Sequence, residues 1–171
     1  RPADAFSVVV FSDRAEVLVP STARFDRSQA ETRIRLLQPH GGTEIYQGLN
    51  LGLAEVQRHQ SRNHKNHILL ITDGRTYGDE TQSLDLAQRA AEMGITISGL
   101  GIGNRWNDAF LDTLASTTGG SSMYVAKPRD IRKYLKELFV GFNKSYAENV
   151  VFHYTPGAVT HLRYAFRLQP E

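Results

Sequence analysis

The sequence contains no cysteine, which excludes a disulfide framework and any metal site built on thiolates. It also lacks an apolar run approaching the roughly 20 residues that a membrane-spanning helix requires, so we expect no membrane insertion within this chain. Positive and negative side chains are also nearly balanced, because the sequence has 20 Lys and Arg and 18 Asp and Glu, which gives a formal net charge of +2. Without a basic stripe, nucleic acid is not expected as a partner.

Two short segments near the N-terminus predict an antiparallel pair of strands. Phe6 to Phe11 is apolar and rich in β-branched residues, and Glu16 to Val19 is a second segment of this kind. The four residues from Ser12 to Ala15 can close a hairpin but cannot form the crossover that parallel strands require. We therefore expect the second strand to lie at an edge of the sheet.

From Arg27 onward, predicted helices alternate with predicted strands. Helices are expected over Arg27–Leu37 with Ile34 and Leu37 inward, over Thr43–Arg58, over Ser83–Met93, over Asp108–Thr117, and in a long segment that opens at Pro128; strands are expected over His67–Thr72, Ile95–Ile102 and Ser122–Val125. Alternation of this kind indicates a mostly parallel sheet with helices on both faces and right-handed crossovers. The expected fold class is therefore α/β, a doubly wound Rossmann-like sheet with one antiparallel edge hairpin.

Gly48 and Gly52 lie one turn apart in the predicted helix from Thr43 to Arg58. Glycine is unfavourable in a helix interior. Two glycines on one side of a helix can, however, let its backbone approach a sheet closely. We interpret the pair as a packing feature.

The C-terminal segment has a different pattern. Val150–Tyr154 and Ala158–Leu168, separated by the turn Thr155–Gly157, predict a β-hairpin. Two interpretations are open: the hairpin begins a following β-rich domain, or it pairs with the same domain as a decoration. With 40% hydrophobic residues the chain can bury one ordinary core, and we place the α/β domain at 1–148 and the hairpin at 149–171, as the start of a following β-rich domain.

Two oxygen-bearing residues are predicted where ligands collect in such a fold. In an open α/β sheet, ligands bind at the carboxyl ends of the strands. Asp73 follows the predicted strand His67–Thr72, and Thr43 stands at a helix N-terminus after Gly41 and Gly42. Taken singly, Thr43 is explained as a helix N-cap and Asp73 as a turn former. Taken together, they offer the hard oxygens that Mg²⁺ prefers.

The order of these motifs resembles the von Willebrand factor A family. Gly42-Thr43 followed by Leu49 resembles its second metal-contacting segment, and Ile71-Thr72-Asp73-Gly74 resembles its third. Val8–Asp13, Gly99–Gly103 and Thr118–Gly120 also look like the family's pattern, which extends to about Asn143. The resemblance implies that Thr43 and Asp73 bind Mg²⁺ or Mn²⁺ in a metal-ion-dependent adhesion site. From their place on the loops at the same rim, we expect Gly42, Gly74, Arg75, Tyr77 and Asp79 to contact a partner, since exposed Arg and Tyr are frequent interface anchors and the charge of Asp79 can bias the choice of partner.

The chain departs from the family at one segment. The family's leading strand lies at the centre of the sheet and ends in Asp-x-Ser-x-Ser, which supplies most of the metal ligands, and no such segment precedes Arg1. Asp26-x-Ser28-x-Ala30 lacks the second serine and falls where a helix needs a cap. We expect that the missing strand, with the remaining ligands, lies outside this N-terminally truncated sequence or is supplied by another chain, so that the cation is incompletely coordinated here.

The resemblance implies a protein-binding module, for adhesion or as a scaffold, that is not an enzyme. Its cation would use an open coordination position to engage a carboxylate of a partner protein. Two alternatives stay open: a nucleotide-using or hydrolytic α/β enzyme domain, and a metal-free scaffold of the same family. The histidines at 59, 64 and 67 suggest a transition-metal site, but they precede a strand and are expected at the opposite end of the sheet.

Overall fold

The computed structural model describes residues 4–24, 26–38, 41–61, 63–76, 78–103, 107–142, 153–155 and 163. The chain forms two compact units, Arg1–Ile131 and Arg132–Glu171. Helix α5 (Ile131–Phe142) makes up most of what is described of the second unit, and the other helices and strands belong to the first. None of the described helices combines the length and apolarity needed to span a bilayer.

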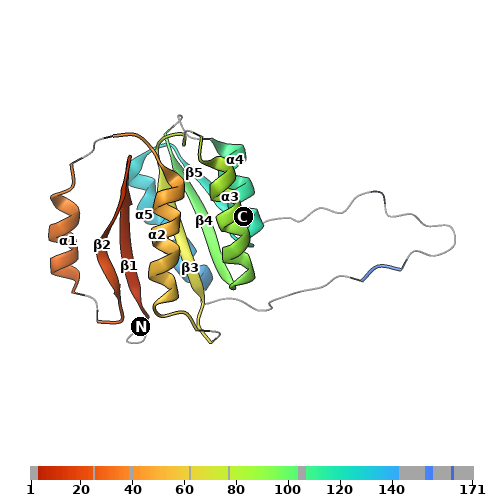
Figure 1. Ribbon diagram of the computed structural model, residues 1–171, viewed down its shortest axis with the longest axis horizontal. Helices are drawn as coiled ribbons and strands as arrows, with labels where there is room; N and C mark the ends of the chain where they lie inside the picture. Colours follow the sequence, from red (N-terminus) through yellow and green to blue (C-terminus); the bar gives the residue numbers. More distant parts are fainter. Residues whose placement is uncertain are drawn as a thin grey trace. The chain divides into compact units, whose positions relative to one another are not determined.

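The strands of the first unit form two separate sheets (Figure 1). Strands β1 (Phe6–Phe11) and β2 (Ala15–Thr22) form the predicted antiparallel hairpin, with Val9 opposite Val17. Strands β3 (Asn66–Thr72), β4 (Ile95–Ile102) and β5 (Ser122–Val125) form a parallel sheet with β4 at its centre. The predicted α/β class with a parallel sheet and an antiparallel hairpin is confirmed.

Strands β1 and β3 run in the same direction, although they are not hydrogen-bonded to each other. Just after β1, the carbonyl of Ser12 accepts a hydrogen bond of 2.8 Å from Glu44 N. Just after β3, Gly74 lies against the side chain of Thr43. Both strands therefore end at the N-terminus of helix α2 (Ile45–Gln57), which packs against β1, β2 and β3 and crosses in front of the space between the sheets in Figure 1.

The core of the first unit lies between the strands and a layer of three helices. Helix α2 contacts α3 (Glu80–Glu92), which contacts α4 (Asp108–Thr117). In α2, Ile45, Leu49 and Leu53 are buried, and Val56 packs against the same core. The other buried members of this core are Leu70, Leu86, Ala87, Ala90, Ile95, Ile97, Phe110, Leu111 and Leu114.

Helix α1 differs from the prediction. It spans Arg27–Arg35, with Asp26 as N-cap accepting a hydrogen bond of 3.1 Å from Gln29 N. The expectation that Ile34 and Leu37 face inward is wrong, because these side chains are 46% and 41% exposed. Of the α1 residues only Ala30 is buried, since the helix packs against the edge strand β2 and not against the central core.

Of the remaining predicted elements, Ile95–Ile102, Asp108–Thr117 and Ser122–Val125 have the predicted ends, and the others keep their type with shifted ends. The segment from Pro128 begins as a 3₁₀ turn (Pro128–Asp130) before α5. The predicted C-terminal hairpin lies almost entirely outside the described residues. His153–Thr155 and Arg163 are described and belong to no helix or strand. The domain boundary at 148/149 stays a prediction.

Candidate functional site

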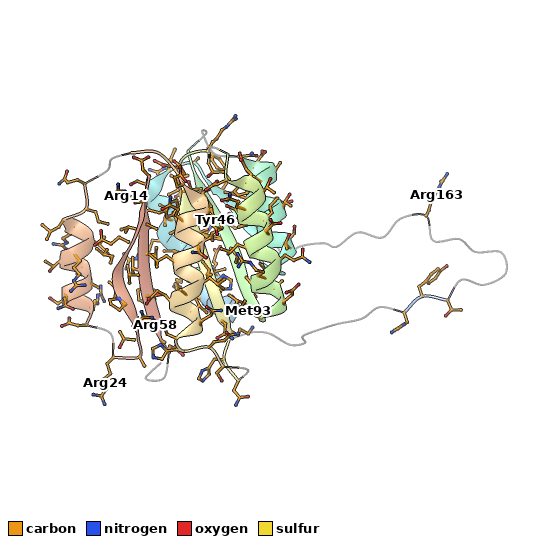
Figure 2. All side chains as sticks on the ribbon, viewed as in Figure 1. Arg14, Arg24, Tyr46, Arg58, Met93 and Arg163 are labelled. Carbon is orange, nitrogen blue, oxygen red and sulfur yellow. The ribbon has the colours of Figure 1, made fainter. Side chains whose placement is uncertain are left out.

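The carboxyl ends of β1 and β3 and the loop before α2 form one surface. It consists of Asp13 after β1, Gly41 to Thr43 before α2, and Asp73 with Gly74 after β3; we call it the strand-end surface. Figure 2 shows Arg14, next to Asp13, at this end of the first unit, and Arg58 and Met93 at the opposite end. Residues that are 30 positions apart in the sequence therefore lie at one edge of the fold.

Thr43 and Asp73 are brought together through Gly74. A Cβ atom placed on Gly74 would lie 2.6 Å from Thr43 Oγ1, closer than any side chain tolerates. Glycine at position 74 therefore lets the Thr43 hydroxyl lie directly beside the residue that follows Asp73. Asp73 itself is exposed.

The Thr43 hydroxyl is not used by the helix that follows it. The N-cap of α2 is Glu44, whose side chain makes no capping hydrogen bond. The interpretation of Thr43 as a helix N-cap is therefore wrong, and the helix begins at Ile45. Within the described part of the chain, neither the Thr43 hydroxyl nor the Asp73 carboxylate has a hydrogen-bond or ion-pair partner. Both oxygens are free to bind a ligand.

Asp79 has a different place from the one expected on the partner-binding rim. Its side chain is only 6% exposed. One carboxylate oxygen accepts a hydrogen bond of 2.7 Å from Tyr46 N, and the other accepts a hydrogen bond from Thr76 Oγ1. Asp79 is buried and accepts a hydrogen bond from the first turn of α2, so its side chain is not available to a partner. The expectation that Asp79 lies on the partner-binding rim is therefore wrong.

The other rim residues fall into three groups. Arg75 is exposed, and Gly42 and Gly74 lie on the strand-end surface. Tyr77 lies outside the described residues. Their contact with a partner stays a prediction.

Two residues of this region had not been selected from the sequence. The Asp13 carboxylate accepts a hydrogen bond from Gly42 N and lies against Gly41, where a Cβ atom would come within 2.5 Å of Asp13 Oδ2. Its position directly after a predicted strand was a usable signal. Thr76 is the second residue. The sequence offered no reason to select it, since it is one of several polar residues in the loop after β3.

The donors at the strand-end surface fit a hard divalent cation in kind. Mg²⁺ and Mn²⁺ prefer oxygen ligands, and a hydroxyl and a carboxylate are both of this type. Two donors do not complete six-fold coordination. No group of three or more His, Asp or Glu side chains suited to a metal occurs among the described residues, at this surface or elsewhere.

The histidines at 59, 64 and 67, around the start of β3, lie at the opposite end of the unit. His59 Nδ1 lies 3.0 Å from Ser21 Oγ on β2. Burial, assisted by the nearby Lys65, lowers the pKa of His67 to about 4, so its ring is neutral at pH 7. Glu55 is buried and binds both Ser21 N, at 2.6 Å, and Arg58 Nε, at 3.0 Å. These contacts join β2 to the end of α2.

Comparison with known proteins identifies relatives of this chain. The model of the von Willebrand factor type A domain matches residues 1–139. The uncharacterized protein sll0103 of Synechocystis is 31% identical over 137 residues, which cover 80% of this chain and 32% of that protein. The chain thus spans about a third of the length of this curated relative.

Solved structures share the fold. The conserved hypothetical protein BatB from Bacteroides thetaiotaomicron aligns with a TM-score of 0.69 at 21% identity, covering 84% of this chain and 81% of that one. Proximal thread matrix protein 1 from the mussel byssus, in a structure with a zinc-occupied MIDAS motif, aligns with a TM-score of 0.65 at 22% identity, covering 79% of this chain and 34% of that one. At these identities the likeness concerns the fold alone.

Proposed function

Because the chain belongs to the von Willebrand factor type A domain family, we propose that its strand-end surface is part of a divalent-cation site through which the chain binds a partner protein. The observation that carries the proposal is the Thr43 hydroxyl beside Gly74, next to the exposed Asp73. Both oxygens lack partners among the described residues. Domains of this family are generally protein-interaction modules, and a solved relative carries a metal at its MIDAS motif.

Thr43 and Asp73 would hold Mg²⁺ or Mn²⁺, directly or through water. When bound, the cation supplies an open coordination position that a carboxylate of the partner can occupy. Asp13 holds the glycine loop in place through Gly42 N. Arg75 and Tyr77 are proposed partner contacts on the rim.

The remaining ligands are proposed to come from a strand between β1 and β3. These two strands have the same direction and end at the same surface, so a parallel strand between them would deliver its carboxyl end beside Thr43 and Asp73. It would also pair the two facing edges, each of which presents backbone N–H and C=O groups. Residues upstream of Arg1 or another chain could supply this strand.

The test is the affinity of the full-length protein for Mg²⁺ and Mn²⁺, measured by calorimetry after treatment with a chelator. Thr43→Ala and Asp73→Ala should each weaken cation binding at least about tenfold, since each removes a direct ligand or its water partner. Their unfolding temperatures in chelator should match that of the wild type. Binding of the partner should require the cation in the wild type and be lost in both variants.

Asp85→Ala is the matched control. It removes an exposed carboxylate from the middle of α3, away from the strand-end surface, and should leave cation affinity unchanged. Wild-type affinity in both Thr43→Ala and Asp73→Ala would refute the proposed site. A wild-type protein that binds its partner equally well in chelator would instead indicate a metal-free scaffold.

A further inference from the structure

Helix α2 begins without a cap from its own sequence. The first amides of a helix have no partner within the helix and need one from elsewhere. Here the side chain of the N-cap residue Glu44 makes no capping bond. The amides of Ile45 and Tyr46 are satisfied instead by the loop after β3, through Thr76 Oγ1 at 3.3 Å and Asp79 Oδ2 at 2.7 Å.

Thr76 and Asp79 form a connected pair. The Thr76 hydroxyl is hydrogen-bonded to the Asp79 carboxylate, and it also lies 3.0 Å from the carbonyl oxygen of Thr43. Both side chains are buried, at 4% and 6% exposed. A negative charge beside a helix N-terminus is favourable as well, because the helix dipole is positive there. The interaction thus joins the loop that carries Asp73 to the segment that carries Thr43.

We infer that Thr76 and Asp79 are positioning residues, which hold the Thr43 hydroxyl at its place beside Gly74; this inference rests on the proposed function. The backbone of the segment is fixed on two sides. Thr76 Oγ1 accepts a hydrogen bond of 3.3 Å from Ile45 N, and the carbonyl of Ser12 accepts one of 2.8 Å from Glu44 N. With the backbone fixed, the position of Thr43 Cβ, from which the hydroxyl projects, is fixed too. Neither Thr76 nor Asp79 is proposed to touch the cation.

The test compares cation affinity with stability in the full-length protein. Thr76→Val keeps the shape of the side chain but removes the hydroxyl. It should weaken Mn²⁺ and Mg²⁺ binding by about 10- to 100-fold, the range expected when a group that orients a metal ligand is lost. Thr76→Ser keeps a hydroxyl at this position, so its affinity for Mn²⁺ and Mg²⁺ should lie within about threefold of the wild type, a smaller loss than in Thr76→Val.

A control separates positioning from general destabilisation. Asp26→Ala removes the N-cap of α1, far from the strand-end surface. It should lower the unfolding temperature but leave cation affinity unchanged. Asp79→Asn is the second variant in case Thr76→Val does not fold. It keeps an acceptor for Tyr46 N, loses the charge, and should weaken cation binding more than Asp26→Ala does.

The two hypotheses fail in different ways. Wild-type affinity in Thr43→Ala would overturn the proposed cation site itself. Weakened affinity in Thr43→Ala together with wild-type affinity in a folded Thr76→Val or Asp79→Asn would overturn only the positioning role. An affinity loss in Asp26→Ala equal to that in Asp79→Asn would also overturn it, because the effect would then follow stability.

Discussion

Gly48 and Gly52 occupy similar positions in α2, yet the structure predicts opposite effects for an added methyl group. A Cβ atom on Gly48 would lie 2.7 Å from Cγ and Cδ1 of Phe11, whereas on Gly52 the nearest atom is Ile68 Cγ2 at 3.9 Å. Replacement of a glycine inside a helix by alanine raises the free energy of unfolding by about 1 kcal/mol, because alanine has the higher helix propensity. Gly52→Ala should therefore stabilise the fold by about that amount.

At Gly48 the same gain is opposed by a steric cost. Forcing a methyl group into a packed site costs about 1 to 3 kcal/mol, and Cγ of Phe11 cannot move aside as the end of a flexible side chain could. Gly48→Ala should therefore change the free energy of unfolding by between roughly zero and 2 kcal/mol, in the destabilising direction. The two variants should differ by about 1 to 3 kcal/mol.

Urea-induced unfolding followed by far-ultraviolet circular dichroism measures the difference. The Phe11→Ala background supplies the control, because without the ring Gly48→Ala should become stabilising, like Gly52→Ala. Equal stabilisation by both alanines in the wild-type background would refute the close packing of α2 on β1. So would an effect of Gly48→Ala that does not depend on Phe11.

Two further predictions concern stability. His67 has a folded-state pKa of about 4, below the value of about 6.5 for an unfolded histidine, so the unfolded state binds the proton first as the pH falls. The contribution of this residue to the free energy of unfolding is full above pH 6.5 and should decline toward pH 4, by up to about 3 kcal/mol. Urea unfolding at several pH values should show that the free energy of unfolding of His67→Phe falls less steeply between pH 6.5 and 5 than that of the wild type. An equal pH dependence in both proteins would contradict the low pKa of His67. Gly120→Ala should be strongly destabilising, by more than the roughly 1 to 3 kcal/mol of ordinary overpacking, because a Cβ atom there would lie 1.9 Å from the backbone oxygen of Ile97. A thermal unfolding midpoint equal to that of the wild type would disprove this contact.

The sequence predicted most of the fold because its strands are marked by strong local patterns. Phe6–Phe11 and Ile95–Ile102 are bounded as predicted, since compact β-branched and apolar runs have few alternative structures. Helix α1 was less predictable. Its apolar residues Ile34 and Leu37 suggested an inward face, but the helix packs on an edge strand that buries only Ala30.

The candidate site was predicted in part, for a physical reason. Thr43 and Asp73 could be selected because each stands at a recognisable boundary in the sequence. The capping of α2 could not, because local sequence offers Thr43 as the cap, while the structure uses Thr76 and Asp79 from more than 30 residues away. A contact between distant loops leaves no periodic pattern, so Asp79 was wrongly predicted to lie on the exposed rim.

Helix α2 packs on strands of both sheets, so the distance between the sheets and the tilt of the helix are coupled. Any change that widens or narrows the space between β1 and β3 must also move the first turn of α2. Thr43 immediately precedes that turn, and Thr76 and Asp79 tie the turn to the loop after β3 that begins with Asp73. A strand placed between β1 and β3 would therefore shift the loop before α2 and the loop after β3 together, because these hydrogen bonds link the two loops.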